Sequence, residues 1–213
     1  GEAVVHEALE EEYEVTVMGL TENANLPSEV IQLIGDRSQL SSLDAVISRK
    51  WDAIVDVIAL SRQDVEQTIR IASSRYIYVS TTLVYDRSSS TAEAIRSDHP
   101  LAKPGTMGGY VDHKLDMEEA VRSSKGPWTI LSPYHVLGPH SFLGCLPLHN
   151  RDPQLLSKIR RGESLELCKG GDIPLNVVHT RDLAKTILRS AQSDASRMKA
   201  YNVSRPRFPA ARI

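Results

Sequence analysis

Several features are scarce in this chain, and each absence argues against a class of function. The 213 residues include two cysteines, Cys145 and Cys168, which lie far apart and lack the spacing of metal ligands. We therefore expect two reduced, inert thiols and no metal site. No apolar run approaches the roughly 20 residues needed to cross a bilayer, and we expect neither a membrane partner nor a signal peptide. A formal net charge of −2 gives no electrostatic reason to expect nucleic acid as a partner. These absences favour a cytoplasmic protein.

The length is that of one globular unit. A chain of 213 residues can bury a single sizeable core with a small appended lobe. We find no internal repeat and no linker, so residues 1–213 are expected to form one domain.

Short apolar runs alternate with segments of helical periodicity along most of the chain. Strands are predicted at residues 14–18, 30–34, 52–58, 76–79, 128–131, 176–179 and 201–203, with helices at 40–46, 64–73, 155–161 and 181–191. The near-continuous apolar run at 52–58 is typical of a strand covered on both faces. Such alternation predicts a parallel sheet between two layers of helices, and right-handed crossovers make it a doubly wound, Rossmann-like α/β fold.

The start of the chain departs from this pattern. Residues 3–9 form an apolar stripe of helical period directly after Gly1, with no strand before them. A doubly wound fold normally begins with a buried strand and a glycine turn that leads into the first helix. We therefore expect that first strand and its turn to be missing from this chain, with Gly1 as the last glycine of the turn. Without the strand, two sheet edges would be left unpaired.

A tyrosine and a lysine are four residues apart within the stretch 108–114. An apolar run of helical period follows them, which places Tyr110 and Lys114 on one face, one turn apart. An ammonium there would lower the pKa of the phenol from about 10 toward neutrality. Such a phenol can transfer a proton near neutral pH. Taken alone, however, the Y-x-x-x-K spacing is common by chance.

Three hydroxyl residues follow the predicted strand 76–79. Ser80, Thr81 and Thr82 stand where the carboxyl end of the strand would present them to a ligand. Taken alone, such residues commonly cap strands and helices. A hydroxyl that holds a substrate oxygen, combined with the tyrosine and lysine, indicates hydride chemistry at a carbinol or carbonyl.

In order and spacing, these motifs resemble the extended short-chain dehydrogenase/reductase superfamily, specifically its NAD-dependent epimerase/dehydratase family. The similar stretches are 1–9 (end of the glycine turn), 35–37 (G-D-x), 79–85 (v-S-S/T-x-x-V-Y), 110–114 (Y-x-x-x-K), 131–139 (l-R-p-x-x-v-y-G-P), 177–184 (f-v-H-v-x-D-l-A) and 201–203 (y-N-v). The resemblance covers nearly the whole chain.

The resemblance implies roles for individual residues. Thr81, Tyr110 and Lys114 would be catalytic. The cofactor would contact Gly1, Asp36, Arg37, Ser80, Tyr110, Lys114, Pro133, Tyr134 and Val136, and the substrate would contact Thr82 and His135. Asp36 has the alternative of being a turn residue only.

Three departures from the family pattern bear on these roles. Ser132 replaces the usual arginine of its motif. Residues 18–21 offer neither an acid for the ribose 2′-hydroxyl nor an arginine for a 2′-phosphate, so the cofactor is NAD or NADP, and Arg37 is a candidate to approach a phosphate. Segments 140–175 and 200–213 would form a small C-terminal substrate lobe that is shorter than usual, as if truncated.

We interpret the chain as an NAD(P)-dependent epimerase/dehydratase that acts by hydride transfer on a hydroxyl or ketone of a sugar or nucleotide sugar. Two alternatives remain open. One is an NAD(P)H-dependent reductase of ketones, and the other is a non-catalytic dinucleotide-binding member of the superfamily, either a regulator or an RNA-associated protein. The resemblance also implies a homodimer.

Overall fold

A four-stranded parallel sheet forms the core of the protein. The computed structural model describes residues 1–71, 73–88, 95–139, 153–165, 174–204 and 208–209. The sheet contains β3 (Ile54–Asp56), β4 (Tyr76–Val79), β5 (Trp128–Pro133) and β9 (Lys199–Val203), in the order β3-β4-β5-β9. All three pairings are parallel, so the carboxyl ends of these strands lie along one edge.

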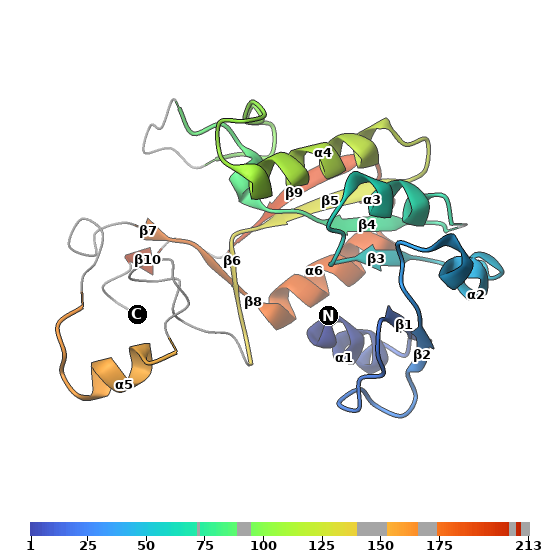
Figure 1. Ribbon diagram of the computed structural model, residues 1–213, viewed down its shortest axis with the longest axis horizontal. Helices are drawn as coiled ribbons and strands as arrows, with labels where there is room; N and C mark the ends of the chain where they lie inside the picture. Colours follow the sequence, from blue (N-terminus) through green and yellow to red (C-terminus); the bar gives the residue numbers. More distant parts are fainter. Residues whose placement is uncertain (72, 89–94, 140–152, 166–173, 205–207, 210–213) are drawn as a thin grey trace.

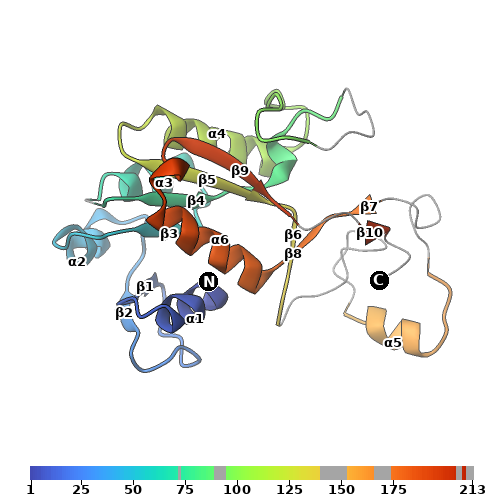
Figure 2. The ribbon, with the colours of Figure 1, turned by 180° about the vertical axis from the view of Figure 1, so that it is seen from behind.

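Helices cover both faces of this sheet (Figures 1 and 2). They are α3 (Arg62–Ile69) and α4 (Gly109–Ser123) on one face, and α6 (Thr180–Gln192), with α1 (Glu2–Glu10) packed against it, on the other. Strand β4 shows why both faces are apolar. Its side chains alternate, so that Tyr76 and Tyr78 join the core under α3 and α4, and Ile77 joins the core under α6.

Three smaller pairs of strands surround this core. Strands β1 (Thr16–Gly19) and β2 (Ile31–Ile34) form a separate parallel pair; β6 (His135–Leu137) and β8 (Val177–His179) form another; β7 (Pro174–Leu175) and β10 (Phe208–Pro209) pair antiparallel. The remaining elements are η1 (Leu40–Leu43), α2 (Asp44–Ile47), η2 (Thr82–Val84), α5 (Leu155–Arg160) and η5 (Asp194–Ser196). Within the described residues, no helix is long and apolar enough to span a membrane.

The predicted fold class is confirmed by this parallel sheet between two helical layers. One boundary differs from the prediction: the strand predicted at 128–131 extends two residues further and includes Pro133. Pro133 is the last residue of β5, where a missing backbone donor interrupts no further ladder. Strands β7 and β10 join the two segments expected to form a substrate lobe, but much of 140–175 lies outside the described residues, so that lobe stays a prediction.

Candidate active site

The carboxyl end of β4 buries three consecutive hydroxyl residues. Ser80, Thr81 and Thr82 are 5%, 9% and 2% exposed. Thr81 is the N-cap residue of η2, and its Oγ1 accepts a hydrogen bond from the backbone N–H of Leu83 at 3.3 Å. The Ser80 Oγ is buried and has no hydrogen-bond partner. A buried hydroxyl without a partner is costly, which makes this strand end a position where a bound polar group would be stabilised.

Helix α4 brings Tyr110 and Lys114 to the same end of the sheet. The residue before the helix, Gly108, has a φ of +92°, a left-handed conformation that a residue with a Cβ rarely adopts. Tyr110 lies in the first turn and is 59% exposed, whereas Lys114, one turn later, is 8% exposed. The two side chains therefore have different surroundings in spite of their spacing.

Lys114 is bonded to β4. Its Nζ donates to the Tyr78 hydroxyl at 3.2 Å and to the Val79 carbonyl at 3.3 Å, and lies 5.0 Å from the centre of the Tyr78 ring. Burial lowers the pKa of Lys114, and the negative charges of Asp56 and Glu118 oppose this effect. This contact between Tyr78 and the lysine was not among the predictions made from the sequence.

Tyr110 interacts with Thr81 instead of the lysine. Burial raises the pKa of Tyr110, and a hydrogen bond with Thr81 partly offsets that rise. In this arrangement the ammonium is held by Tyr78 and Val79 and does not lower the pKa of Tyr110, so that effect of Lys114 stays a prediction for a rearranged side chain. The chain nevertheless gathers a hydroxyl, a phenol and an amine at one strand end, the groups that proton transfer at a carbinol requires.

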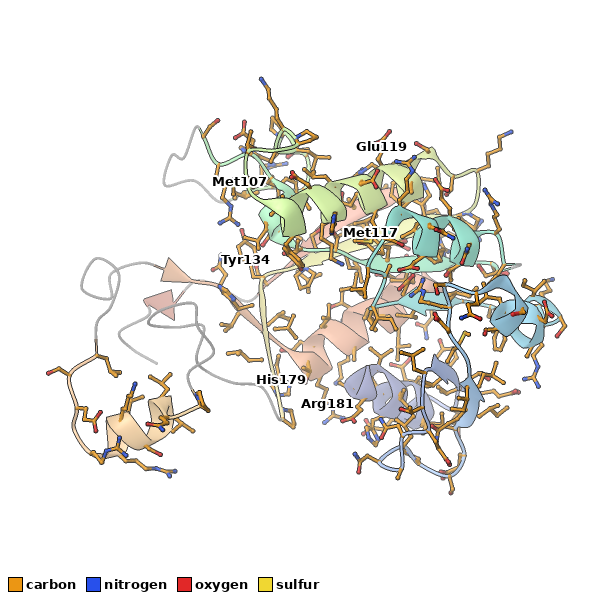
Figure 3. All side chains as sticks on the ribbon, in the orientation of Figure 1. Met107, Met117, Glu119, Tyr134, His179 and Arg181 are labelled. Atoms are coloured by element: carbon orange, nitrogen blue, oxygen red, sulfur yellow. The ribbon has the colours of Figure 1, made fainter. Side chains whose placement is uncertain are left out.

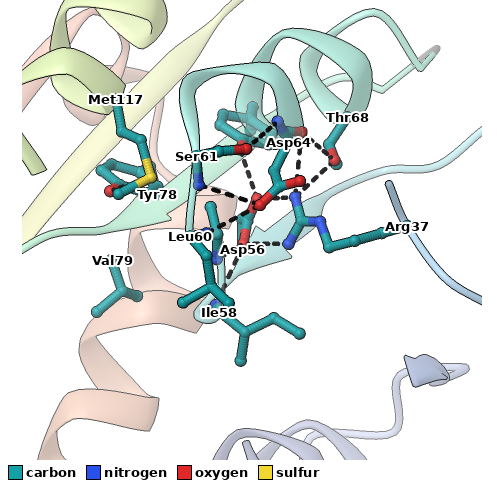
Figure 4. A network of polar contacts seen from close by, with 12 residues as sticks. Arg37, Asp56, Ile58, Leu60, Ser61, Asp64, Thr68, Tyr78, Val79 and Met117 are labelled. Atoms are coloured by element: carbon teal, nitrogen blue, oxygen red, sulfur yellow. Dashed lines mark hydrogen bonds and ion pairs between the residues drawn. The ribbon is translucent and has the colours of Figure 1, made fainter. Parts of the chain in front are cut away.

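Arg37 lies in a buried polar network between β3 and α3 (Figure 4). Its guanidinium donates two hydrogen bonds to Asp56, Nη1 to Oδ1 at 2.8 Å and Nη2 to Oδ2 at 2.5 Å. Nη2 also donates to the Thr68 hydroxyl at 2.7 Å and to the Asp64 carbonyl at 3.2 Å. In this arrangement the terminal nitrogens of Arg37 are held in the network, and contact with a cofactor phosphate stays a prediction.

The other predicted contacts lie at or after the ends of strands or, for Gly1, before a helix. The Asp36 carboxylate accepts hydrogen bonds from the N–H and hydroxyl of Ser38 at 2.9 and 2.7 Å, which is the geometry of a turn residue, and these bonds lower its pKa. Pro133 ends β5, Tyr134 follows it, and His135 and Val136 form β6. Gly1 precedes α1. For these residues, contact with a ligand stays a prediction.

Apolar side chains are exposed where β1, β2 and β3 end. Leu20, Ile34, Ile58 and Leu60 are 72%, 56%, 57% and 80% exposed. A cavity of about 590 Å³ opens at the same end of the β1–β2 pair, lined in part by Gly19, Leu20, Asn23 and Ile34. An exposed group of large apolar residues beside a cavity suits an apolar or planar ligand.

On the face of the sheet covered by α6, ion pairs join residues that lie far apart in the sequence. Arg181, at the start of α6, lies beside α1 (Figure 3). It donates from Nε to Glu7 at 3.0 Å and from Nη2 to Glu10 at 2.6 Å. The arginine therefore ties α6 to α1, away from the hydroxyl residues of β4.

Comparison with known proteins gives a family match and a fold match. The model of the NAD dependent epimerase/dehydratase family matches residues 63–204. No curated protein matches the chain.

Several solved structures share the fold. The Bordetella bronchiseptica enzyme WbmH in complex with NAD⁺ is 17% identical, with a TM-score of 0.75 over 100% of this chain and 74% of that one. The dTDP-glucose 4,6-dehydratase from Bacillus anthracis in complex with NAD is 15% identical, with a TM-score of 0.74 over 98% of this chain and 73% of that one. The B. bronchiseptica enzyme WbmG in complex with NAD and UDP is 18% identical, with a TM-score of 0.74 over 100% of this chain and 71% of that one. At these identities the likeness shows the fold alone.

Proposed function

Because the chain belongs to the NAD dependent epimerase/dehydratase family, we propose that it is an NAD(P)-dependent enzyme that acts by hydride transfer on a hydroxyl or ketone of a sugar or nucleotide sugar. One observation carries the proposal beyond the family: Thr81, Tyr110 and Lys114 gather at the carboxyl end of β4. Ligands of doubly wound sheets bind at this edge. The NAD and UDP named with structures of the same fold support the cofactor and the substrate class.

The residues at the edge fit a dinucleotide. The partnerless Ser80 hydroxyl offers a hydrogen bond to a polar group of the cofactor, and Lys114 adds a positive charge beside it. The exposed apolar side chains Leu20, Ile34 and Ile58 would cover a planar base. Bound NAD(P) supplies the acceptor and donor of hydride. With Arg37 held by Asp56, the chain would lack an arginine for a 2′-phosphate, which supports NAD as the proposed cofactor.

The side chains of the site divide the proton chemistry among them. Thr81 donates a hydrogen bond to the substrate oxygen. Tyr110, as the phenolate, takes the proton of the substrate hydroxyl. Lys114 lowers the pKa of Tyr110 when its ammonium turns from Tyr78 toward the phenol, because a nearby positive charge favours the phenolate. An epimerisation would return both the hydride and, from Tyr110, the proton to the same carbinol, whereas a dehydration would lose water and return the hydride to the same substrate.

Tyr110→Phe tests the catalytic assignment. We expect turnover of nucleotide sugars to fall by about 10²–10⁴-fold, the usual contribution of a general acid–base. In calorimetric titrations with NAD⁺ and NADP⁺, the Tyr110→Phe variant should have the same dissociation constants as the parent protein. Tyr201→Phe is the matched control, since Tyr201 lies on β9 and its hydroxyl bonds only to the Ala195 carbonyl among the contacts described. A Tyr110→Phe variant that turns over at the parent's rate would show that the tyrosine is not the acid–base.

A non-catalytic dinucleotide-binding protein is the second candidate. It is favoured by the raised pKa of Tyr110 and by the position of Lys114 on Tyr78. Saturable NAD binding without turnover of any sugar nucleotide or ketone would support this role. Stoichiometric consumption of added NADH or NADPH would instead indicate the ketone reductase.

A further inference from the structure

Tyr78 contacts the Lys114 ammonium in two ways. Its hydroxyl accepts a hydrogen bond from Nζ at 3.2 Å, and its ring centre lies 5.0 Å from the same atom. A cation that close to an aromatic ring is attracted to the electron-rich face. The Val79 carbonyl provides a second acceptor at 3.3 Å. We call Tyr78 and the Val79 carbonyl together the lysine seat.

The lysine seat lies in the protein core. Tyr78 is fully buried in the core formed by β4, α3 and α4, and its hydroxyl donates to the Met117 sulfur at 3.5 Å. Burial, followed by the charge of Asp56, raises the pKa of Tyr78 far above its ordinary value. The phenol therefore stays neutral, and its oxygen remains an acceptor for the lysine. Because Tyr78 is packed on every side, movement between the two residues must come from the lysine.

Acidic side chains support the charge of the seated lysine. Glu118 follows Lys114 by one helical turn and is 1% exposed, and Asp56 is the last residue of the neighbouring strand β3, where it pairs in register with Tyr78. Of the Glu118 oxygens, Oε2 pairs with Arg122 and Oε1 has no hydrogen-bond partner. Burial favours the neutral amine and lowers the pKa of Lys114; this negative charge and the two acceptors of the seat offset only part of that effect.

We propose that Tyr78 is a positioning residue for Lys114: it holds the ammonium at the carboxyl end of β4, protonated and ready to turn toward Tyr110. The turn of the lysine toward Tyr110 has a role only in the proposed function, so this part of the proposal rests on it. The contact between Tyr78 and Lys114 can be tested without measuring turnover. It assigns a role to a residue that touches neither substrate nor reacting atoms.

Tyr78→Phe removes the acceptor and keeps the ring. We expect the protonation constant of Lys114 to fall about ten-fold, since a hydrogen bond to the charged form is lost while the lysine stays buried. The constant is measured by NMR titration of the lysine ε-carbon signals, with Lys114 assigned by its absence from Lys114→Met. In the same variant, the pH profile of kcat should move, because a less charged lysine supports the Tyr110 phenolate less well.

Tyr76→Phe is the matched control. Tyr76 lies on the same face of β4, is 2% exposed, and its hydroxyl donates to Asp56 at 2.8 Å. This variant makes the same chemical change two residues away, so the protonation constant of Lys114 should stay within two-fold of the parent's. An unchanged constant in Tyr78→Phe, or an equal change in Tyr76→Phe, would overturn the lysine seat.

If the Tyr78→Phe variant does not fold, a second measurement on the parent protein tests the proposal. In the parent, the seated ammonium should exchange its protons with water at least ten-fold more slowly than exposed Lys125. Equal exchange rates would also overturn the proposal. The two proposals fail separately: a parent that does not bind NAD(P) disproves the proposed function, while the titration and the exchange rates still decide the seat.

Discussion

Replacing Arg37 by methionine should reveal how strongly the buried ion pair under β3 stabilises the fold. Asp56 is 1% exposed at its side chain and Arg37 19%. Two hydrogen bonds join them, at 2.8 and 2.5 Å, and hydrogen bonds to charged groups contribute about 1.5–3 kcal/mol each. Removing one partner of a buried pair costs about 3–5 kcal/mol, because the other charge is left without compensation. Since Arg37 is partly exposed, we expect a loss near the lower limit, about 3 kcal/mol.

Urea denaturation at pH 7 measures this loss as a change in the free energy of unfolding. The double variant Arg37→Met/Asp56→Asn should be more stable than Arg37→Met alone, because it leaves no unpaired buried charge. Arg62→Met is the control: Arg62 also bonds two elements, but its partners Asp116 and Glu119 are exposed, and such pairs stabilise little. A loss below about 1 kcal/mol for Arg37→Met would refute the reasoning, since it would equal that of an exposed pair.

The pH dependence gives an independent check. Burial alone would raise the pKa of Asp56, but the hydrogen bonds and charge of Arg37 outweigh it and lower the pKa. A lowered pKa in the folded state contributes stability that is complete above the ordinary aspartate pKa of about 3.9 and is lost as the pH falls through the folded value. In Arg37→Met the pKa of Asp56 rises, so the stability gap between parent and variant should narrow on acidification. A constant gap would contradict the assignment.

Three further outcomes are expected. Asn202→Ala should destabilise the protein by about 1–3 kcal/mol in urea, because it leaves the buried Tyr85 hydroxyl (2.8 Å from Asn202 Oδ1) and the Ile95 carbonyl unpaired; no loss would show that water replaces both bonds. Gly138→Ala should cost about 1–3 kcal/mol in thermal melting, since its Cβ would overlap the Thr180 side chain; an unchanged melting temperature would contradict this. Burial raises the pKa of Tyr85 to about 12, so stability should fall as the pH rises from 10 toward 12, less steeply in Tyr85→Phe; equal slopes in urea titrations would refute this.

Much of the fold could be predicted because apolar runs mark buried strands. Strand β4 occupies 76–79 as expected, and β2 and β8 begin within one residue of their predicted positions. The alternation of strands and helices was enough to predict the parallel sheet. Pro133 shows the limit at element ends: whether a proline ends or breaks a strand depends on where the neighbouring ladder stops.

The side-chain partners within the site could not be predicted in the same way. The Tyr110–Lys114 spacing follows from helix geometry, but the lysine is bonded to Tyr78, which lies 36 positions earlier. Arg37 likewise bonds to Asp56, 19 positions later. In both cases a long cationic side chain binds an acceptor that is distant in the sequence and comes near only when the chain is packed. The alternation of tyrosines on β4 was the available signal, because it placed two hydroxyls on one face of a strand.

The packing of α1 against α6 has a consequence for the folding of the chain during its synthesis. The two helices carry the ion pair between Glu7 and Arg181, 174 positions apart. At a synthesis rate of about 5–20 residues per second, α1 waits on the order of ten seconds or longer before its partner exists. During that time the apolar side chains of Val4 and Val5 have no surface of α6 to cover them. Helix α1 is therefore among the last elements to reach its native contacts.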